Sequence, residues 1–90
     1  MADQDRPVVV YWRPGCQYCA QLRSSLGSLA DDAQWVNIWQ DPQAAEFVRS
    51  VNAGNEVVPT VVFDGIAITN PPPAVVRDRL EAASRPDARG

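Results

Sequence analysis

The chain has 90 residues, of which 46% are hydrophobic and 21% are charged, and these values are typical of one folded domain. It contains no histidine and no lysine, which excludes histidine-based nucleophilic catalysis, histidine-ligated zinc and Schiff-base chemistry. The net charge of −3 argues against a nucleic-acid partner, because proteins that bind nucleic acids normally carry a surplus of basic residues.

The first predicted element is a strand over residues 8–12, where every residue is β-branched or aromatic. Pro14 and Gly15 end this strand. From Gln17 to Leu29 the apolar residues recur at helical spacing, which predicts an amphipathic helix. Gly27 weakens the last turn of this helix, because glycine in a helix interior costs about 1 kcal/mol relative to alanine.

The rest of the chain predicts a strand, a helix, a hairpin and a final helix. Asp41 and Pro42 supply the N-cap and the first residue of the middle helix. The pair Asp64-Gly65 favours a type I′ turn and therefore a two-stranded hairpin. The five elements are predicted over residues 35–39, 42 to about 52, 60–63, 66–69 and about 74–83.

The element order β-α-β-α-β-β-α predicts an α/β fold with a mixed four-stranded sheet and helices on both faces. The β-α-β crossover makes its two strands parallel, and the hairpin adds an antiparallel pair. We expect a single domain over residues 1–90. Its core should cover about 7–83, with flexible ends over 1–6 and 84–90.

The sequence shows no sign of a membrane or export segment. Its longest apolar run, residues 8–12, is far shorter than the roughly 20 residues that a membrane-spanning helix needs. Residues 1–5 are polar and acidic, unlike a signal peptide. We therefore expect a cytoplasmic protein with no membrane partner, whose thiols are reduced or transiently oxidised. We also expect a monomer.

The motif Cys16-Gln17-Tyr18-Cys19 follows the first strand and begins the first helix. Unpaired N–H groups and the dipole at a helix start favour a thiolate, which is the reactive form of cysteine, and Arg13 would add positive charge nearby. Cys19 lies one turn further along, on the inward face, and should be more buried. Cys16 is therefore predicted as the attacking thiol, and Cys19 as the thiol that resolves the mixed disulfide.

The residues alone allow other roles for the two cysteines. A zinc site needs four ligands, and the chain has no third cysteine and no histidine, so no metal site is expected. Two structural thiols could simply pack in the core, although a helix start is an unusual place for them. An iron–sulfur cluster could be bridged between two chains with external thiols. A redox dithiol after a strand is the interpretation that this position favours most.

The second informative feature is Val58-Pro59 before the hairpin. A trans bond is the ordinary state, because only about 5% of X–Pro bonds in folded proteins are cis. A cis bond would instead leave the Val58 backbone facing Cys16, where it could bind an extended thiol substrate by strand-like hydrogen bonds. The residues alone leave both states open.

With these features in order, the chain resembles the thioredoxin fold in its glutaredoxin branch, and above all the mycoredoxins, the actinobacterial counterparts of glutaredoxin. The resemblance covers about residues 8–80. It rests on the cysteine motif and on further segments of the sequence, namely residues 44–48, 50–52, 54–55, 58–61 and 69–71.

The resemblance implies a thiol–disulfide oxidoreductase that reduces mixed disulfides between proteins and mycothiol, the low-molecular-weight thiol of those bacteria. In the family's monothiol cycle the first cysteine, here Cys16, takes the small thiol from the substrate and is released by a second mycothiol. The resemblance implies no tightly bound cofactor, mycothiol as co-substrate, and an indirect dependence on a flavoprotein disulfide reductase. It also implies a cis bond before Pro59.

Substrate contacts are expected around the two cysteines, from Arg13, Gln17, Tyr18, Val58, Pro59, Thr69 and Asn70. Trp39 could add an apolar wall.

The Gly-Gly turn with acidic residues that holds glutathione in glutaredoxins is missing, and prolines 71–73 stand in its place. Because proline has no N–H, these residues disfavour an anion site at the last helix and hence glutathione. Gln17, where the family has Gly or Pro, departs from the pattern in the loop that sets thiol acidity.

Two other functions remain as alternatives. A dithiol redoxin reduced directly by thioredoxin reductase has a similar sequence, but it carries a Trp-Ser-Gly-Phe-Arg-Pro segment where this chain has residues 69–73. A non-enzymatic carrier could hold an iron–sulfur cluster between two chains through Cys16 and small thiols. A mixed-disulfide reductase is the main expectation.

Overall fold

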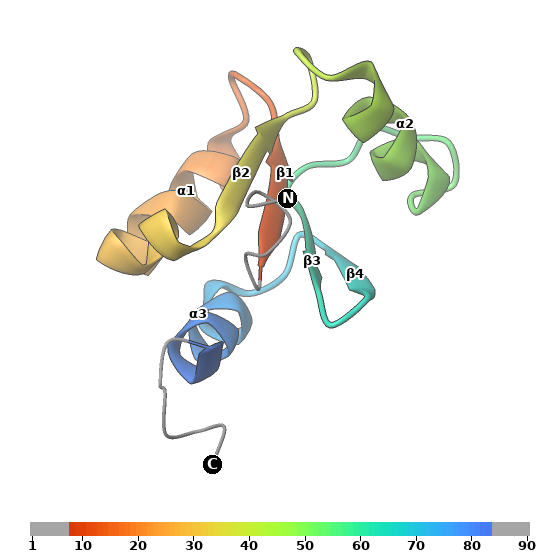
Figure 1. Ribbon diagram of the computed structural model, residues 1–90. Coiled ribbons are helices and arrows are strands. Elements are labelled where there is room, and N and C mark those ends of the chain that lie inside the picture. Colours follow the sequence, from red (N-terminus) through yellow and green to blue (C-terminus); the bar gives the residue numbers. More distant parts are fainter. Residues whose placement is uncertain (1–7, 84–90) are drawn as a thin grey trace.

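Within residues 8–83, which are the residues that the structure describes, four strands form one mixed sheet in the order β2-β1-β3-β4 (Figure 1). In this computed structural model the strands are β1 (Val9–Trp12), β2 (Gln34–Asn37), β3 (Thr60–Phe63) and β4 (Ile66–Thr69). Strand β1 is parallel to β2 and antiparallel to β3, and β3 is antiparallel to β4. The predicted mixed sheet is confirmed. The flexible ends predicted for residues 1–6 and 84–90, and residue 7 of the predicted core, lie outside the described residues.

Helices cover both faces of the sheet, as the element order predicts. In the described part of the chain they are α1 (Gln17–Leu26), the 3-10 helix η2 (Gly27–Asp32), α2 (Pro42–Ser50) and α3 (Pro73–Ala83). Helices α1 and α3 pack on one face and α2 on the other (Figure 1). None of the helices in residues 8–83 has the length and apolar character needed to cross a membrane.

The first apolar cluster fills the face under α1 and α3, and we call it the α1–α3 cluster. Its members are at most 4% exposed and are Val8, Val10, Leu22, Leu26, Ala30, Ala33, Val61, Val76 and Leu80. Val8 and Val10 reach it together because alternate residues of a strand point to the same face. This closed cluster is the main core of the domain.

The second apolar cluster lies under α2 and extends to the cysteines, and we call it the α2 cluster. Its buried members are Cys19, Ile38, Ala44, Ala45, Val48 and Val58. The N-cap Asp41 fixes the start of α2, because its Oδ1 accepts hydrogen bonds from the N–H groups of Gln43 (3.1 Å) and Ala44 (3.2 Å). Helix α2 then carries its apolar face onto the sheet beside the first turn of α1.

The structure corrects the predicted end of the first helix. Helix α1 ends at Leu26 and not at Leu29. Gly27 adopts φ 59°, a left-handed conformation that favours glycine and ends an α-helix, and its N–H donates to Arg23 O and Ser24 O. The chain then continues as the 3-10 helix η2, so Leu29 is only partly buried.

The second strand is also shorter than predicted, since Ile38 and Trp39 belong to the turn that leads to α2. The side chain of Asn37 closes this turn, because its Oδ1 accepts a hydrogen bond from the Trp39 N–H (2.9 Å). The middle helix also ends earlier than the predicted residue 52, because α2 stops at Ser50, and Val51 is 41% exposed. The Asp64-Gly65 hairpin turn is as predicted, with φ of 54° and 75° at its two residues.

Candidate active site

The loop between β1 and α1 places the cysteines at the end of β1. Pro14 and Gly15 turn the chain, and Gly15 has φ 80°, which favours glycine. The Cys16 N–H donates to Arg13 O (3.4 Å) and closes this turn. Helix α1 starts at Gln17, so Cys16 occupies its N-cap position. The predicted location of Cys16 at a helix start is confirmed.

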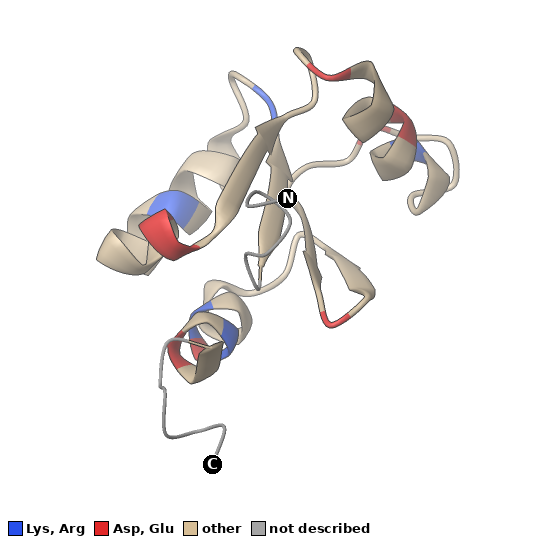
Figure 2. Ribbon diagram, in the orientation of Figure 1, with Lys and Arg blue, Asp and Glu red and all other residues tan. Residues whose placement is uncertain are grey.

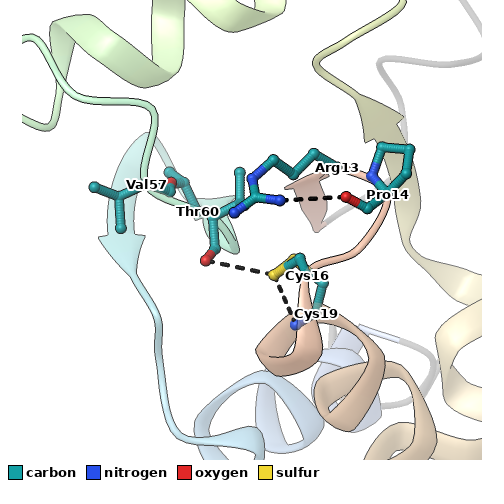
Figure 3. The surroundings of a disulfide bond; sticks show 7 residues. Arg13, Pro14, Cys16, Cys19, Val57 and Thr60 are labelled. Carbon is teal, nitrogen blue, oxygen red and sulfur yellow. Dashed lines mark hydrogen bonds between the residues drawn. A yellow bond between two sulfur atoms is a disulfide. The ribbon is translucent and has the colours of Figure 1, made fainter.

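Cys16 and Cys19 are joined by a disulfide, with their Cα atoms 5.2 Å apart. Cys16 is half-buried, whereas Cys19 is 4% exposed, so the predicted difference in burial is confirmed. The Cys19 N–H donates to the Sγ of Cys16 at 3.1 Å (Figure 3). In the reduced protein an N–H in this position, at the positive end of α1, stabilises a thiolate more than a thiol. The geometry therefore favours Cys16 as the reactive sulfur.

The Val58–Pro59 peptide bond is cis, as the family resemblance implies. Both residues are buried, and the Val58 carbonyl oxygen lies 3.7 Å from the Sγ of Cys16. Among the described residues the Val58 N–H forms no backbone hydrogen bond. An unpaired backbone N–H next to the disulfide is what an extended substrate segment needs for strand-like pairing.

Asn52 holds this loop in place, a role that the sequence analysis did not assign to it. Its Nδ2 donates to Val48 O (2.8 Å) and to the hydroxyl of Thr60 (3.2 Å), and its Oδ1 accepts from the Thr69 hydroxyl. The Thr60 hydroxyl, fully buried, donates in turn to Val57 O (2.7 Å). These bonds tie α2, β3 and β4 together around the segment that carries the cis bond.

A cavity of about 380 Å³ opens beside the disulfide, and we call it the arginine–tryptophan cavity. It is lined by Trp12, Arg13, Gly15, Cys16, Cys19, Ala20, Arg23 and Trp35. The indole of Trp35 is anchored, because its Nε1 donates to Ala30 O (2.7 Å). The Arg23 guanidinium lies 4.9 Å from the centre of the Trp35 ring, within cation–π distance.

The sequence predicts Arg13 at this site but not Arg23 or the two tryptophans. Helical spacing contained a signal for Arg23, since residues 16, 19, 20 and 23 recur on one face of α1. Trp12 and Trp35 come from paired strands, and only the sheet register brings them to this face. Trp39 is 62% exposed and lies outside the cavity wall, 5.8 Å from the Arg13 guanidinium.

A second cavity, of about 250 Å³, lies on the opposite side of α1, and we call it the tyrosine–asparagine cavity. Its lining consists of Tyr18, Gln21, Leu22, Asn70 and prolines 71–73. It brings together two predicted substrate contacts, Tyr18 and Asn70. Gln17 is exposed in the first turn of α1. The Thr69 hydroxyl donates a hydrogen bond to Asn52. Neither residue lines the arginine–tryptophan cavity or the tyrosine–asparagine cavity.

A larger cavity, of about 470 Å³, lies on the α2 side of the sheet and contains neither cysteine. Tyr11, Asp41 and Phe47 are among its lining residues. Burial and the nearby Asp41 raise the pKa of Tyr11. No group of three or more Cys, His, Asp or Glu side chains in residues 8–83 could hold a metal ion. We place the candidate active site at the smaller arginine–tryptophan cavity because it holds the two sulfurs.

Comparison with known proteins agrees with this geometry. The sequence profile of the Glutaredoxin family matches residues 8–68, which include both cysteines and Pro59. The chain is 41% identical over 76 residues to Mycoredoxin 1 of Corynebacterium glutamicum, an alignment that covers 83% of the chain and 94% of that protein. It is 40% identical over 74 residues to a Mycobacterium tuberculosis protein provisionally named a glutaredoxin, covering 81% and 88% of the two chains. The chain belongs to the glutaredoxin family of thiol–disulfide oxidoreductases.

Proposed function

We propose that this protein reduces mixed disulfides between proteins and mycothiol, with Cys16 as the nucleophile and Cys19 as the resolving thiol. The observation that carries the assignment of roles is the hydrogen bond from the Cys19 N–H to the Sγ of Cys16 (3.1 Å). It places Cys16 where a thiolate is favoured, at the edge of a cavity. Cys19 is only 4% exposed. Its thiol can therefore react only with a disulfide that has already formed on Cys16.

The reaction consists of two thiol–disulfide exchanges. First, the Cys16 thiolate attacks the mycothiol sulfur of the substrate, a Cys16–mycothiol disulfide forms, and the substrate protein leaves as a thiolate that takes a proton from water. Second, the thiolate of another mycothiol attacks the mycothiol sulfur held by Cys16. Mycothiol disulfide forms and Cys16 leaves as a thiolate. A flavoprotein disulfide reductase then regenerates mycothiol, so this chain needs no redox cofactor of its own.

Cys19 offers a second route by which the Cys16–mycothiol disulfide can be resolved. Its thiolate can attack the Sγ of Cys16, which expels mycothiol as a thiolate and forms the intramolecular disulfide. The 5.2 Å separation of the Cα atoms is within the range of disulfides, and the bond is formed in this structure. This disulfide also supports the second candidate function, a dithiol redoxin that thioredoxin reductase reduces directly.

The preference for mycothiol over glutathione rests on the loop before α3. Helix α3 starts at Pro73, directly after Pro71 and Pro72, so its first residue and the two residues before it have no N–H to offer to a carboxylate. Glutathione presents carboxylates to its binding site, whereas mycothiol is an uncharged, sugar-linked thiol. The tyrosine–asparagine cavity offers an aromatic ring and an amide to a sugar. The 41% identical relative is named Mycoredoxin 1.

The test uses the reduced Cys19→Ser variant, which cannot expel a thiol from Cys16. We expect that mycothiol disulfide forms an adduct on Cys16, seen as an increase in intact mass and located by peptide fragmentation, and that glutathione disulfide reacts more slowly. Faster reaction with glutathione would contradict the mycothiol preference. Turnover of wild-type protein with NADPH and thioredoxin reductase, without turnover with mycothiol, would establish the second candidate instead.

A further inference from the structure

The dithiol lies in a locally positive part of an acidic protein. Residues 9–26 contain Arg13 and Arg23 and no acidic residue, although the whole chain carries a net charge of −3. In Figure 2 the loop after β1 and helix α1 carry basic segments, while η2, the α2 region and the β3–β4 turn carry acidic ones. Both arginines line the arginine–tryptophan cavity, and no acidic side chain does. A negatively charged group is therefore attracted to this cavity.

Neither guanidinium is neutralised by a carboxylate within residues 8–83. Arg23 lies over the Trp35 ring at 4.9 Å, and Arg13 donates to a neighbouring backbone carbonyl. By contrast, Arg49 forms an ion pair with Glu56 on the other side of the sheet. A guanidinium stacked on an aromatic ring keeps its N–H groups free to bind a carboxylate, and the ring restricts its motion. Arg23 is thus held ready for an anionic partner.

A mixed disulfide has two halves, and both must fit next to Cys16. In the proposed function the small thiol takes the tyrosine–asparagine cavity, on one side of α1. The arginine–tryptophan cavity lies on the opposite side of α1, and both cysteines line it. An uncharged sugar-linked thiol has no carboxylate for Arg23 to bind. The arginine–tryptophan cavity therefore suits the other half of the substrate, which is the protein.

We propose that the arginine–tryptophan cavity binds the protein half of the substrate disulfide and selects segments with acidic side chains next to the reactive cysteine. Trp12 and Trp35 form the apolar walls, and the guanidinium groups of Arg13 and Arg23 bind the carboxylates. This inference rests on the proposed function in two respects, the role of Cys16 as nucleophile and the binding of the small thiol in the tyrosine–asparagine cavity, but its test uses no mycothiol.

The test measures the first exchange step with peptides of equal length. Each peptide has one cysteine, flanked by Asp or by Asn, in a mixed disulfide with uncharged 2-mercaptoethanol. The Cys16 thiolate of the reduced wild-type protein attacks the mercaptoethanol sulfur, a Cys16–mercaptoethanol disulfide forms, and the peptide leaves as a thiolate that is quantified by chromatography. We expect the second-order rate constant to be about threefold higher for the Asp peptide at low salt, and the ratio to fall as salt screens the charges.

Matched variants assign the preference to the cavity. Arg23→Gln should bring the Asp:Asn ratio close to one, Arg23→Lys should keep most of it, and Arg49→Gln, which removes the same charge on the far side of the sheet, should leave it as in wild type. The net charge of −3 alone predicts the reverse preference, for less acidic peptides. A wild-type ratio of one or below, or an equal loss with Arg49→Gln, would overturn the inference. If mycothiol disulfide fails to form the Cys16 adduct described above while the peptide ratio holds, the mycothiol proposal fails and this inference stands.

Discussion

The two apolar clusters of this domain differ in what they surround. The α1–α3 cluster consists of aliphatic side chains that are at most 4% exposed, drawn from both helices and the central strands. The α2 cluster contains Cys19 and Val58, and half-buried Cys16 packs against it. The first cluster is closed, whereas the second ends at a reactive sulfur and at the loop that faces it. Stability therefore depends mainly on the α1–α3 cluster, and reactivity on the end of the domain where the α2 cluster meets the cysteines. Changes in the two clusters should have different consequences.

The largest expected effect comes from exchanging sulfur for oxygen at the edge of the α2 cluster. Cys16→Ser should abolish reduction of mixed disulfides, because a serine hydroxyl is not ionised at neutral pH and cannot form the mixed disulfide. Cys19→Ser should keep most of this activity through the monothiol route. It should also destabilise the domain by about 1 to 3 kcal/mol, since a hydroxyl replaces a thiol that is 4% exposed. Activity assays with a mycothiolated peptide and urea unfolding measure the two effects.

The control for this pair is the mass of the trapped intermediate. Cys19→Ser should accumulate a Cys16 adduct under turnover, and Cys16→Ser should accumulate none. Full activity of Cys16→Ser would contradict the assignment of the nucleophile.

The next largest effect belongs to the α1–α3 cluster. Leu80→Ala removes a fully buried side chain of α3 and should lower the free energy of unfolding by about 2 to 5 kcal/mol. The folded variant should still react with a small disulfide at the wild-type rate, because Leu80 contacts neither cavity beside the cysteines. Val75→Ala, at a 39% exposed position of the same helix, is the control and should change stability by less than about 0.5 kcal/mol. A slow Leu80→Ala enzyme under conditions where it is folded would show that the two clusters are coupled.

Asn52 tests an intermediate case, in which one substitution lowers both stability and reactivity. Asn52→Ala removes the hydrogen bonds that link α2 to the hydroxyls of Thr60 and Thr69, and leaves the buried Thr60 hydroxyl with one partner fewer. We expect a loss of about 1 to 3 kcal/mol in stability. We also expect a severalfold lower kcat/KM for mixed disulfides, because the loop that places Val58 beside Cys16 is less restrained.

Asn55→Ala is the control, since this exposed side chain only donates to Asn52 O within the same turn. Asn52→Ser keeps a hydroxyl at this position but cannot reach all three partners, so its kcat/KM should fall between those of wild type and Asn52→Ala. A wild-type kcat/KM in Asn52→Ala would show that Asn52 does not position the loop beside Cys16.

Short-range patterns predicted most of the fold and the chemistry of this domain. The strand order follows from one crossover and one hairpin, and Asp64-Gly65 adopts the predicted turn because both residues tolerate positive φ. The helix start explains Cys16 without any long-range contact. The cis bond at Pro59 needed the family resemblance, because the proline alone favours trans.

Long-range contacts account for what the sequence could not predict. Asn52 and Thr69 are 17 positions apart, and no period of the chain links them; only folding brings their side chains together. The Trp12–Trp35 wall likewise depends on the β1–β2 register. The sequence predicts that Gly27 weakens the last turn of the helix, but the positive φ of Gly27, which ends α1 at Leu26, depends on how the chain enters η2.

The smallest expected effect concerns the outer edge of the α2 cluster, where Tyr11 packs against Phe47 with ring centres 5.1 Å apart. Burial and the nearby Asp41 raise the pKa of Tyr11 above its ordinary value of 10.0. The folded state therefore holds the phenol proton more tightly than the unfolded state does. This stabilisation is fully present below pH 10 and is lost as the pH rises through the raised pKa. Wild-type protein should thus lose stability more steeply than Tyr11→Phe in that range, measured as urea midpoints against pH. Parallel curves for Tyr11→Phe and wild type would mean that water reaches this edge of the α2 cluster as freely as it reaches the unfolded chain.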